Sequence, residues 1–139
     1  EYVNQAFLGM SNLLSGDVKI DDVTIKTEID NLYIIPSGES PPNPLEMISS
    51  RETEKFFETI ADRYDYVIVD CPPLGIVPDA LILMKYSKIN LYVVRENFTE
   101  KKIMFETLKD VRQMDADQFY LVYNDERLPR KEMKNRYYY

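Results

Sequence analysis

Hydrophobic residues in this chain follow two patterns that alternate along its length. Short unbroken apolar runs, bounded by charged residues or proline, are typical of strands buried on both faces of a sheet. Four such runs lie at residues 32–35, 66–69, 91–94 and 119–123. Between them, apolar residues recur at the three- and four-residue spacing of amphipathic helices. This alternation predicts an α/β fold built from βαβ units, a parallel sheet with helices on both faces.

Capping residues and prolines mark where the helices should begin. Asn43 precedes Pro44, a common first helical residue, so a helix is expected to start there. Residues 49–52 offer a second N-terminal cap, which predicts a break near Ser50 before a longer helix. Further helices are expected within 4–14, from Pro78 and from a cap at Thr99. Residues 17–31 are predicted to form a surface connection with a short β segment at 23–25.

Composition narrows the class of protein. A chain of 139 residues that is 45% hydrophobic has enough apolar content for a core, and we expect one domain at residues 1–126. Residues 127–139 are basic, lack helical periodicity and are predicted to be a flexible tail. The net charge of −7 argues against a partner nucleic acid or anionic lipid found through overall charge. No run approaches the roughly 18 apolar residues of a membrane span, so the piece is expected to be cytoplasmic.

Histidine is absent and Cys71 is the single cysteine, which excludes His-based triads, zinc sites and internal disulfides. Without a cationic partner in the sequence nearby, Cys71 is interpreted as a small buried hydrophobe rather than a nucleophile. The chain also has only four glycines, and none belongs to the phosphate-binding pattern G-x-x-x-x-G-K-S/T. Taken by itself, the chain is therefore not expected to hydrolyse ATP or transfer phosphate from it.

Asp70 stands at the carboxyl end of the apolar run 66–69 and is followed, after Cys71, by two prolines. Ligands of open α/β sheets bind beyond the carboxyl ends of the strands. A carboxylate at that place suits a Mg²⁺–phosphate site, because Mg²⁺ prefers oxygen ligands. The residues alone leave two readings of Asp70 open, a metal ligand and a cap for the following loop.

Several segments occur in an order that resembles the cytoplasmic domain of bacterial tyrosine kinases, P-loop ATPases of the MinD/ParA-like branch. They are LGMSNLLSG at 8–16, NLYIIPSGESPPNP at 31–44, YDYVIVDCPPLGIVPDALIL at 64–83, LYVVRENFT at 91–99, VYND at 122–125 and the terminal YYY. The resemblance covers nearly the whole chain and implies a P-loop NTPase fold, with ATP and Mg²⁺ as cofactors. That fold is incomplete without the strand that leads into the Walker A phosphate loop, which is expected before Glu1.

Position by position, the resemblance implies roles for individual residues. Asp70 is similar to the Walker B aspartate that helps hold Mg²⁺, which makes it the candidate catalytic and metal-binding residue. Asn124 is similar to the asparagine that contacts adenine, although an asparagine at a strand end also commonly bridges loop backbone. The tail residues resemble tyrosines that neighbouring subunits phosphorylate in trans: Tyr137, Tyr138 and Tyr139.

Two residues depart from the family pattern. Asp79 lies in a segment that resembles the family's T-D-A sequence, but Pro78 replaces the threonine, so Asp79 is a further candidate whose role stays open. Cys71 replaces the usual hydroxyl residue after the aspartate. Because a thiol is a poorer hydrogen-bond partner, support for a metal ligand at Asp70 is expected to differ.

The resemblance leads to a first hypothesis and two alternatives. Under the first hypothesis, the chain is part of an ATP-dependent protein-tyrosine autokinase that regulates capsule and exopolysaccharide export. It would belong to the cytoplasmic domain of an inner-membrane protein. It would form homo-oligomers and work with a membrane polysaccharide co-polymerase. The first alternative is a non-catalytic ATPase-fold module that binds such a co-polymerase, and the second is a relative of partitioning or cofactor-assembly ATPases. In the absence of the phosphate-loop strand, Val67 and Val69 are expected to expose an apolar edge.

Overall fold

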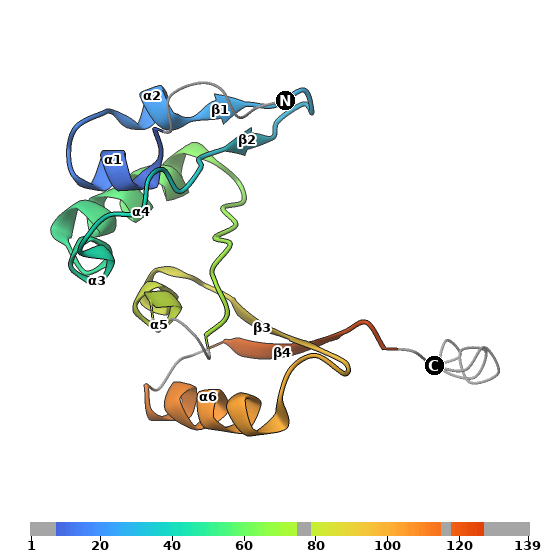
Figure 1. Ribbon diagram of the computed structural model, residues 1–139. Helices are drawn as coiled ribbons and strands as arrows, with labels where there is room; N and C mark the ends of the chain where they lie inside the picture. The colour runs from blue at the N-terminus through green and yellow to red at the C-terminus, as the bar shows by residue number, and fades with distance from the viewer. Residues whose placement is uncertain (1–7, 75–78, 115–117, 127–139) are drawn as a thin grey trace. The chain divides into compact units, whose positions relative to one another are not determined.

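The computed structural model describes residues 8–74, 79–114 and 118–126 (Figure 1). The chain divides into two compact units, Glu1–Asp70 and Cys71–Tyr139, and each is described by itself. The tail at 127–139 lies outside the described residues, so the expected boundary after residue 126 stays a prediction. No helix in the described ranges combines the length and apolar character that crossing a membrane requires.

The first unit contains four helices and two short strands in its described part. They are α1 (Met10–Leu14), α2 (Ile20–Val23), β1 (Ile25–Lys26), β2 (Tyr33–Ile34), α3 (Pro44–Ile48) and α4 (Arg51–Arg63). β1 and β2 pair antiparallel, with Ile25 opposite Ile34. The prediction of a buried parallel strand at 32–35 is therefore wrong here. A two-residue strand that pairs only with β1 leaves both of its side chains exposed.

The first turn of α1 is joined to the segment that follows β2. The Met10 N–H donates to the Pro36 carbonyl at 2.8 Å, and the Ser11 N–H donates to the Ser37 carbonyl at 3.0 Å. These bonds require close backbone approach at Gly9, where a Cβ atom would collide with the Gly38 nitrogen and the Pro36 oxygen. Gly9 directly precedes the first residue of α1, and the absence of a Cβ atom there permits attachment of the helix to residues 36–38.

The predicted break near Ser50 is confirmed, because α3 ends at Ile48 and α4 begins at Arg51. The Ser50 hydroxyl oxygen accepts the Thr53 N–H at 3.3 Å and caps α4. The Thr53 hydroxyl in turn donates to the Met47 carbonyl at 2.8 Å, at the end of α3. Thr53 is only 2% exposed, so this bond satisfies a buried hydroxyl at the junction of the helices.

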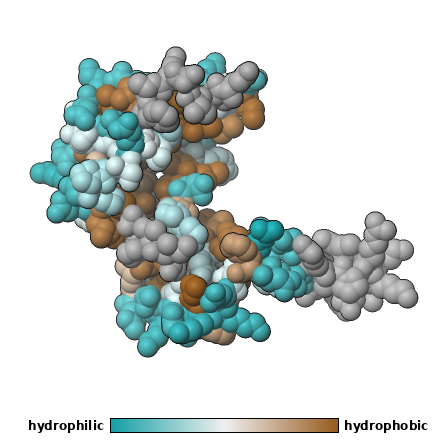
Figure 2. All heavy atoms as spheres, in the orientation of Figure 1, coloured by the Kyte–Doolittle hydropathy of each residue, from teal (hydrophilic) through white to brown (hydrophobic). Residues whose placement is uncertain are grey.

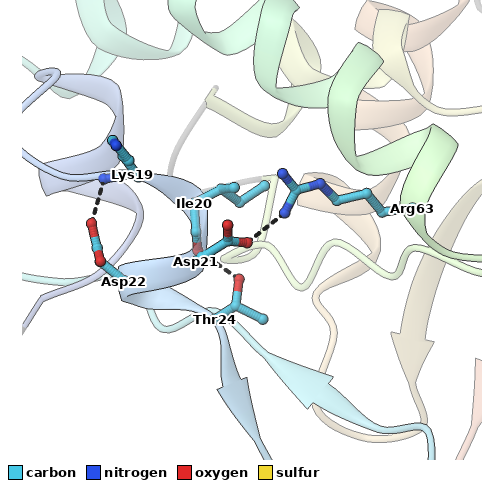
Figure 3. Close-up of polar contacts among 6 residues, drawn as sticks. All are labelled: Lys19, Ile20, Asp21, Asp22, Thr24 and Arg63. Atoms are coloured by element: carbon cyan, nitrogen blue, oxygen red, sulfur yellow. Dashed lines mark hydrogen bonds and ion pairs between the residues drawn. The ribbon is translucent and has the colours of Figure 1, made fainter.

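Helix α2 lies within the stretch predicted to be a surface connection, and Figure 3 shows how it is held. At its start, a carboxylate oxygen of Asp22 accepts the Lys19 N–H at 2.8 Å. At its end, the Thr24 hydroxyl donates to the Ile20 carbonyl at 2.7 Å. The adjacent Asp21 forms an ion pair with Arg63 of α4, with 2.6 Å between Oδ1 and Nη1. This long-range pair joins α2 to the end of α4.

The second unit contains the parallel pair of strands that the pattern predicts. Its described elements are α5 (Asp79–Leu83), a 3₁₀ turn (Met84–Tyr86), β3 (Asn90–Arg95), α6 (Lys101–Gln113) and β4 (Phe119–Asn124). β3 and β4 pair in parallel from Asn90 opposite Phe119 to Arg95 opposite Asn124. The strands predicted at 91–94 and 119–123 are therefore confirmed as a parallel pair, but their expected burial on both faces is not, because most side chains of β3 and β4 are exposed. Val94 of β3 and Val111 of α6 are buried, as expected where a connecting helix covers a parallel pair.

The cap of α6 differs from the prediction by one residue. Glu100, not Thr99, precedes the first turn of the helix. The Thr99 hydroxyl instead accepts the main-chain N–H of Arg95, at 2.9 Å. Thr99 therefore closes the turn between β3 and α6 rather than capping the helix.

Residues 66–69 do not form the predicted buried strand. They have no regular secondary structure, and Tyr66 and Ile68 are 90% and 91% exposed. Val67 and Val69 are also exposed, as expected if the run lacks a neighbouring strand. An apolar run becomes a buried strand only when other strands accept and donate its main-chain hydrogen bonds, and no described residue does so. Figure 2 shows hydrophobic side chains at the surface among hydrophilic ones.

Candidate functional site

Asp70 is the last residue of the first unit and follows the exposed apolar run 66–69. Its carboxylate is exposed and makes no hydrogen bond or ion pair with the described residues. The loop-cap reading needs a bond from this carboxylate to nearby backbone, and the described part of the following loop supplies none. The arrangement leaves the Asp70 oxygens available to an external cation.

The surroundings of Asp70 decide what kind of metal its carboxylate suits. The described parts of the chain contain no cluster of three or more His, Cys, Asp or Glu residues that could hold an ion. Mg²⁺ bound to a nucleotide keeps several waters and phosphate oxygens, so it takes only one or two protein carboxylates. One exposed carboxylate therefore fits nucleotide-bound Mg²⁺ and does not fit an ion held by protein ligands alone.

Asn124 ends β4 in the second unit, and its side chain is exposed. Its amide oxygen accepts the N–H of Asp125 at 2.8 Å. The amide nitrogen has no partner among the described residues. The sequence leaves two alternatives for Asn124, a bond to loop backbone and a contact with a ligand. In the structure the amide oxygen makes the backbone bond, and the amide nitrogen stays available for a ligand.

Arg95 lies directly across from Asn124 at the end of β3, and the sequence analysis did not single it out. Its Nε and Nη2 atoms are each 2.9 Å from Oδ2 of Asp125. The guanidinium carbon also lies 5.6 Å from the centre of the Phe98 ring, a cation–π distance. The signal that could have found it is an arginine at the carboxyl end of one predicted strand and an Asn-Asp pair at the end of the next.

Acidic residues surround the same edge of the β3–β4 pair. The pKa of the Tyr123 phenol is raised above its ordinary value, first by partial burial and then by the negative charges of Glu96 and Glu126. Both causes favour the neutral phenol. Tyr123 therefore adds no charge to this edge at neutral pH, where Arg95 and Asp125 form an ion pair.

Among the described residues, the structure does not show any two of the predicted site residues in one site. Asp70 belongs to the first unit and Asn124 to the second, so their sharing one site stays a prediction. Asp79 is the first residue of α5, but its side chain lies outside the described residues. The predicted phosphoacceptors also lie outside them: Tyr137, Tyr138 and Tyr139.

A family model described as an AAA domain matches residues 3–114. The chain belongs to the AAA domain family. It is similar to tyrosine-protein kinase ptk of Acinetobacter johnsonii, with 32% identity over 117 residues, or 84% of this chain and 16% of that protein. It is also similar to tyrosine-protein kinase CpsD of Streptococcus agalactiae serotype III (strain NEM316). There the identity is 34% over 98 residues, or 67% of this chain and 42% of that protein.

The similarity extends to solved structures. The crystal structure of the chimerical protein CapA2B2 matches with a TM-score of 0.82 and 31% identity, covering 89% of this chain and 55% of that one. The chain spans less than half the length of the two curated relatives. The resemblance to bacterial tyrosine kinases, stated from six short segments, is confirmed over most of the chain, and the fold matched is that of P-loop kinase domains.

Proposed function

We propose that this AAA-domain chain is part of an ATP-dependent protein-tyrosine kinase that serves a capsule or exopolysaccharide system. The relatives named tyrosine-protein kinases support the reaction class. The observation that carries the proposal is the Asp70 carboxylate, exposed and unpaired among the described residues, inside the stretch that matches the family. An acidic side chain in that condition is a suitable ligand for the metal of a nucleotide.

In this proposal, each candidate residue has a separate task. Asp70 supplies one oxygen ligand to the metal of Mg·ATP, and Asn124 contacts the base. When bound, Mg²⁺ neutralises charge that develops on the phosphates during transfer. The protein's own contribution is positioning, because a phosphoryl group passes between oxygens with little covalent chemistry from side chains. The receiving hydroxyls belong to Tyr137, Tyr138 and Tyr139 of a neighbouring subunit.

Tail phosphorylation also offers a means of regulation. Each phosphate adds about −1.5 to −2 charge to a segment that now carries Lys131, Lys134 and Arg136. Repeated phosphorylation would make this basic tail acidic and so weaken its binding to the acidic remainder of the chain, which is more negative than the −7 of the whole chain because the tail is basic. We propose that this change loosens a homo-oligomer attached to a membrane polysaccharide co-polymerase on the cytoplasmic side.

The metal role of Asp70 is tested by Asp70→Asn in the complete kinase that contains this chain. Tail phosphotyrosine is measured with Mg·ATP, and phosphate incorporation is expected to fall by about 100-fold or more, since losing a metal ligand removes several kcal/mol of charge stabilisation. Asp65→Asn is the matched control, because Asp65 is also an exposed carboxylate beside the same apolar run. Equal phosphorylation in the Asp70 and Asp65 variants would contradict the role.

The non-catalytic alternative makes a different prediction in the same experiment. The two readings differ in whether the complete protein carries a phosphate-binding glycine pattern, which these 139 residues do not contain. If the complete protein binds a co-polymerase but incorporates no phosphate into its tail with Asp70 intact, the chain is a regulatory module. Phosphorylation of the tail tyrosines excludes that alternative.

A further inference from the structure

We infer that Arg95 is a positioning residue for nucleotide recognition: through Asp125 it holds the Asn124 carboxamide so that its NH₂ group is free to donate to a bound base. The inference rests on the proposed function, since it concerns how a nucleotide is recognised at this edge. It specifies which atom of the base Asn124 recognises: a purine ring nitrogen that accepts a hydrogen bond. It also adds a residue pair that the proposed function does not use.

The orientation of the Asn124 carboxamide follows from one hydrogen bond. The Asp125 N–H requires an acceptor, and the atom 2.8 Å away on Asn124 must therefore be the amide oxygen. The NH₂ group cannot take that place, because it has no lone pair to offer. It points away from this bond and has no partner among the described residues. The outward half of the side chain is thus a hydrogen-bond donor.

This orientation depends on the backbone of Asp125. Asp125 has φ of 59°, in the left-handed region that L residues seldom adopt. Backbone of this kind costs free energy and persists only where surrounding contacts hold it. The Arg95 guanidinium supplies such contacts, with Nε and Nη2 both 2.9 Å from one carboxylate oxygen of Asp125.

Arg95 is itself held in place by the β3–β4 pair. It is the last residue of β3 and lies opposite Asn124 in the parallel register, so both strands end at the same edge (Figure 1). The main-chain N–H of the next residue, Glu96, donates to the Asn124 carbonyl at 3.0 Å, which extends the pairing past Arg95. The Arg95 N–H is bound by the Thr99 hydroxyl. The guanidinium therefore reaches Asp125 from a fixed backbone.

An outward donor limits which base atoms Asn124 can contact. In purines, N7 is an acceptor in both adenine and guanine, whereas the adenine amino group is a donor. A donor pairs with an acceptor, so N7 is a suitable partner and the adenine amino group is not. We therefore expect the NH₂ group of Asn124 to contact a purine through N7, an acceptor that adenine and guanine share.

The test compares ATP with 7-deaza-ATP, which lacks the N7 acceptor, in equilibrium binding to the complete kinase. Wild-type protein is expected to bind 7-deaza-ATP about fivefold to tenfold more weakly than ATP, the effect of one lost hydrogen bond. In Arg95→Gln and in Asn124→Ala, this ratio is expected to fall to about one, because the donor is no longer held in place or is absent. Arg112→Gln is the control, since it removes an exposed arginine of α6 and should keep the ratio.

The ratio separates positioning from general loss of structure. A variant that merely folds poorly weakens both nucleotides equally and keeps the ratio, so an unchanged ratio in Arg95→Gln overturns the inference. A wild-type ratio of one also overturns it and leaves the proposed function intact. Failure of the complete kinase to bind either nucleotide overturns both. Loss of the ratio in Arg95→Gln but not in Arg112→Gln supports the inference.

Discussion

At the scale of single residues, Thr53 shows how one hydroxyl joins two helices. Its side chain is almost fully buried, and a polar group in that position costs free energy unless it is hydrogen-bonded. Here the Thr53 hydroxyl satisfies the Met47 carbonyl at the end of α3, while the Thr53 N–H satisfies the Ser50 cap of α4. The break between the helices therefore depends on Thr53 as much as on Ser50.

Thr53→Val tests this dependence, because valine keeps the branched shape and removes only the hydroxyl. The free energy of unfolding of the chain is expected to fall by about 1 kcal/mol, since the partly buried Met47 carbonyl loses one of its two donors and keeps only the Ser50 N–H. Urea unfolding measures the change. Thr59→Val is the control: its hydroxyl donates to the Lys55 carbonyl on an exposed face of α4, and a change within about 0.5 kcal/mol is expected.

The ion pair between Asp21 and Arg63 is a second feature at this scale. The two side chains are 78% and 41% exposed, so water and salt screen their attraction. A double-mutant cycle with Asp21→Asn and Arg63→Gln is expected to give a coupling free energy of about 0.2–1 kcal/mol at low ionic strength. The coupling should shrink when urea unfolding is repeated in about 1 M salt. A coupling unchanged by salt would show that the pair acts through packing instead.

At the scale of elements, α1 depends on a neighbour far away in the sequence. A helix of five residues has too few internal hydrogen bonds to be stable alone. The bonds from Met10 and Ser11 to the segment after β2 supply what the helix lacks. They form because glycines at positions 9 and 38 let the two backbones approach closely.

Gly9→Ala is expected to detach α1 from the segment after β2, because the added Cβ collides with backbone atoms that cannot move aside easily. Amide hydrogen exchange at Met10 and Ser11 is the measurement, and both should exchange faster. Gly16→Ala is the matched control. Gly16 has φ of 84° but nothing within 4 Å of its Cβ position, so that variant strains the chain without blocking the contact. Equal protection loss in both variants would contradict the account.

At the scale of the whole chain, the exposed apolar run at 66–69 is a liability. A hydrophobic segment without strand partners tends to pair with another chain. Four consecutive residues here are exposed and apolar: Tyr66, Val67, Ile68 and Val69. We therefore expect the 139-residue chain, prepared alone, to self-associate through this run.

Replacing Val67 and Val69 by lysine is expected to suppress this self-association, because two like charges oppose pairing of the run between chains. Sedimentation velocity gives the distribution of oligomers. The control replaces Ile29 and Ile89 by lysine, which changes the net charge equally at exposed apolar positions outside the run. If both double variants reduce association to the same extent, the effect comes from net charge and not from residues 66–69.

Sequence patterns predicted best those elements whose causes are local. The break between α3 and α4 follows from a cap at Ser50. The elements β3, α6 and β4 follow one another in the sequence and form a single βαβ unit. Asp70 stands out in the sequence because it follows an apolar run, whereas the site role of Asn124 came only from the family resemblance, and both roles stay predictions. Arg95 was missed, since its partner Asp125 is 30 residues away and the contact exists only once the two strands are in register.

The sequence by itself thus determined the helical periodicities, the cap of α4, the parallel β3–β4 pair and the amide residue at the end of β4. Only the tertiary structure decided the state of 32–35 and 66–69. Both runs have the composition of buried strands, but a strand obtains its hydrogen bonds and its burial from other segments. A helix forms its main-chain hydrogen bonds within itself, whereas a strand needs neighbouring strands. Among the described residues, the run 32–35 has one short partner strand and the run 66–69 has none.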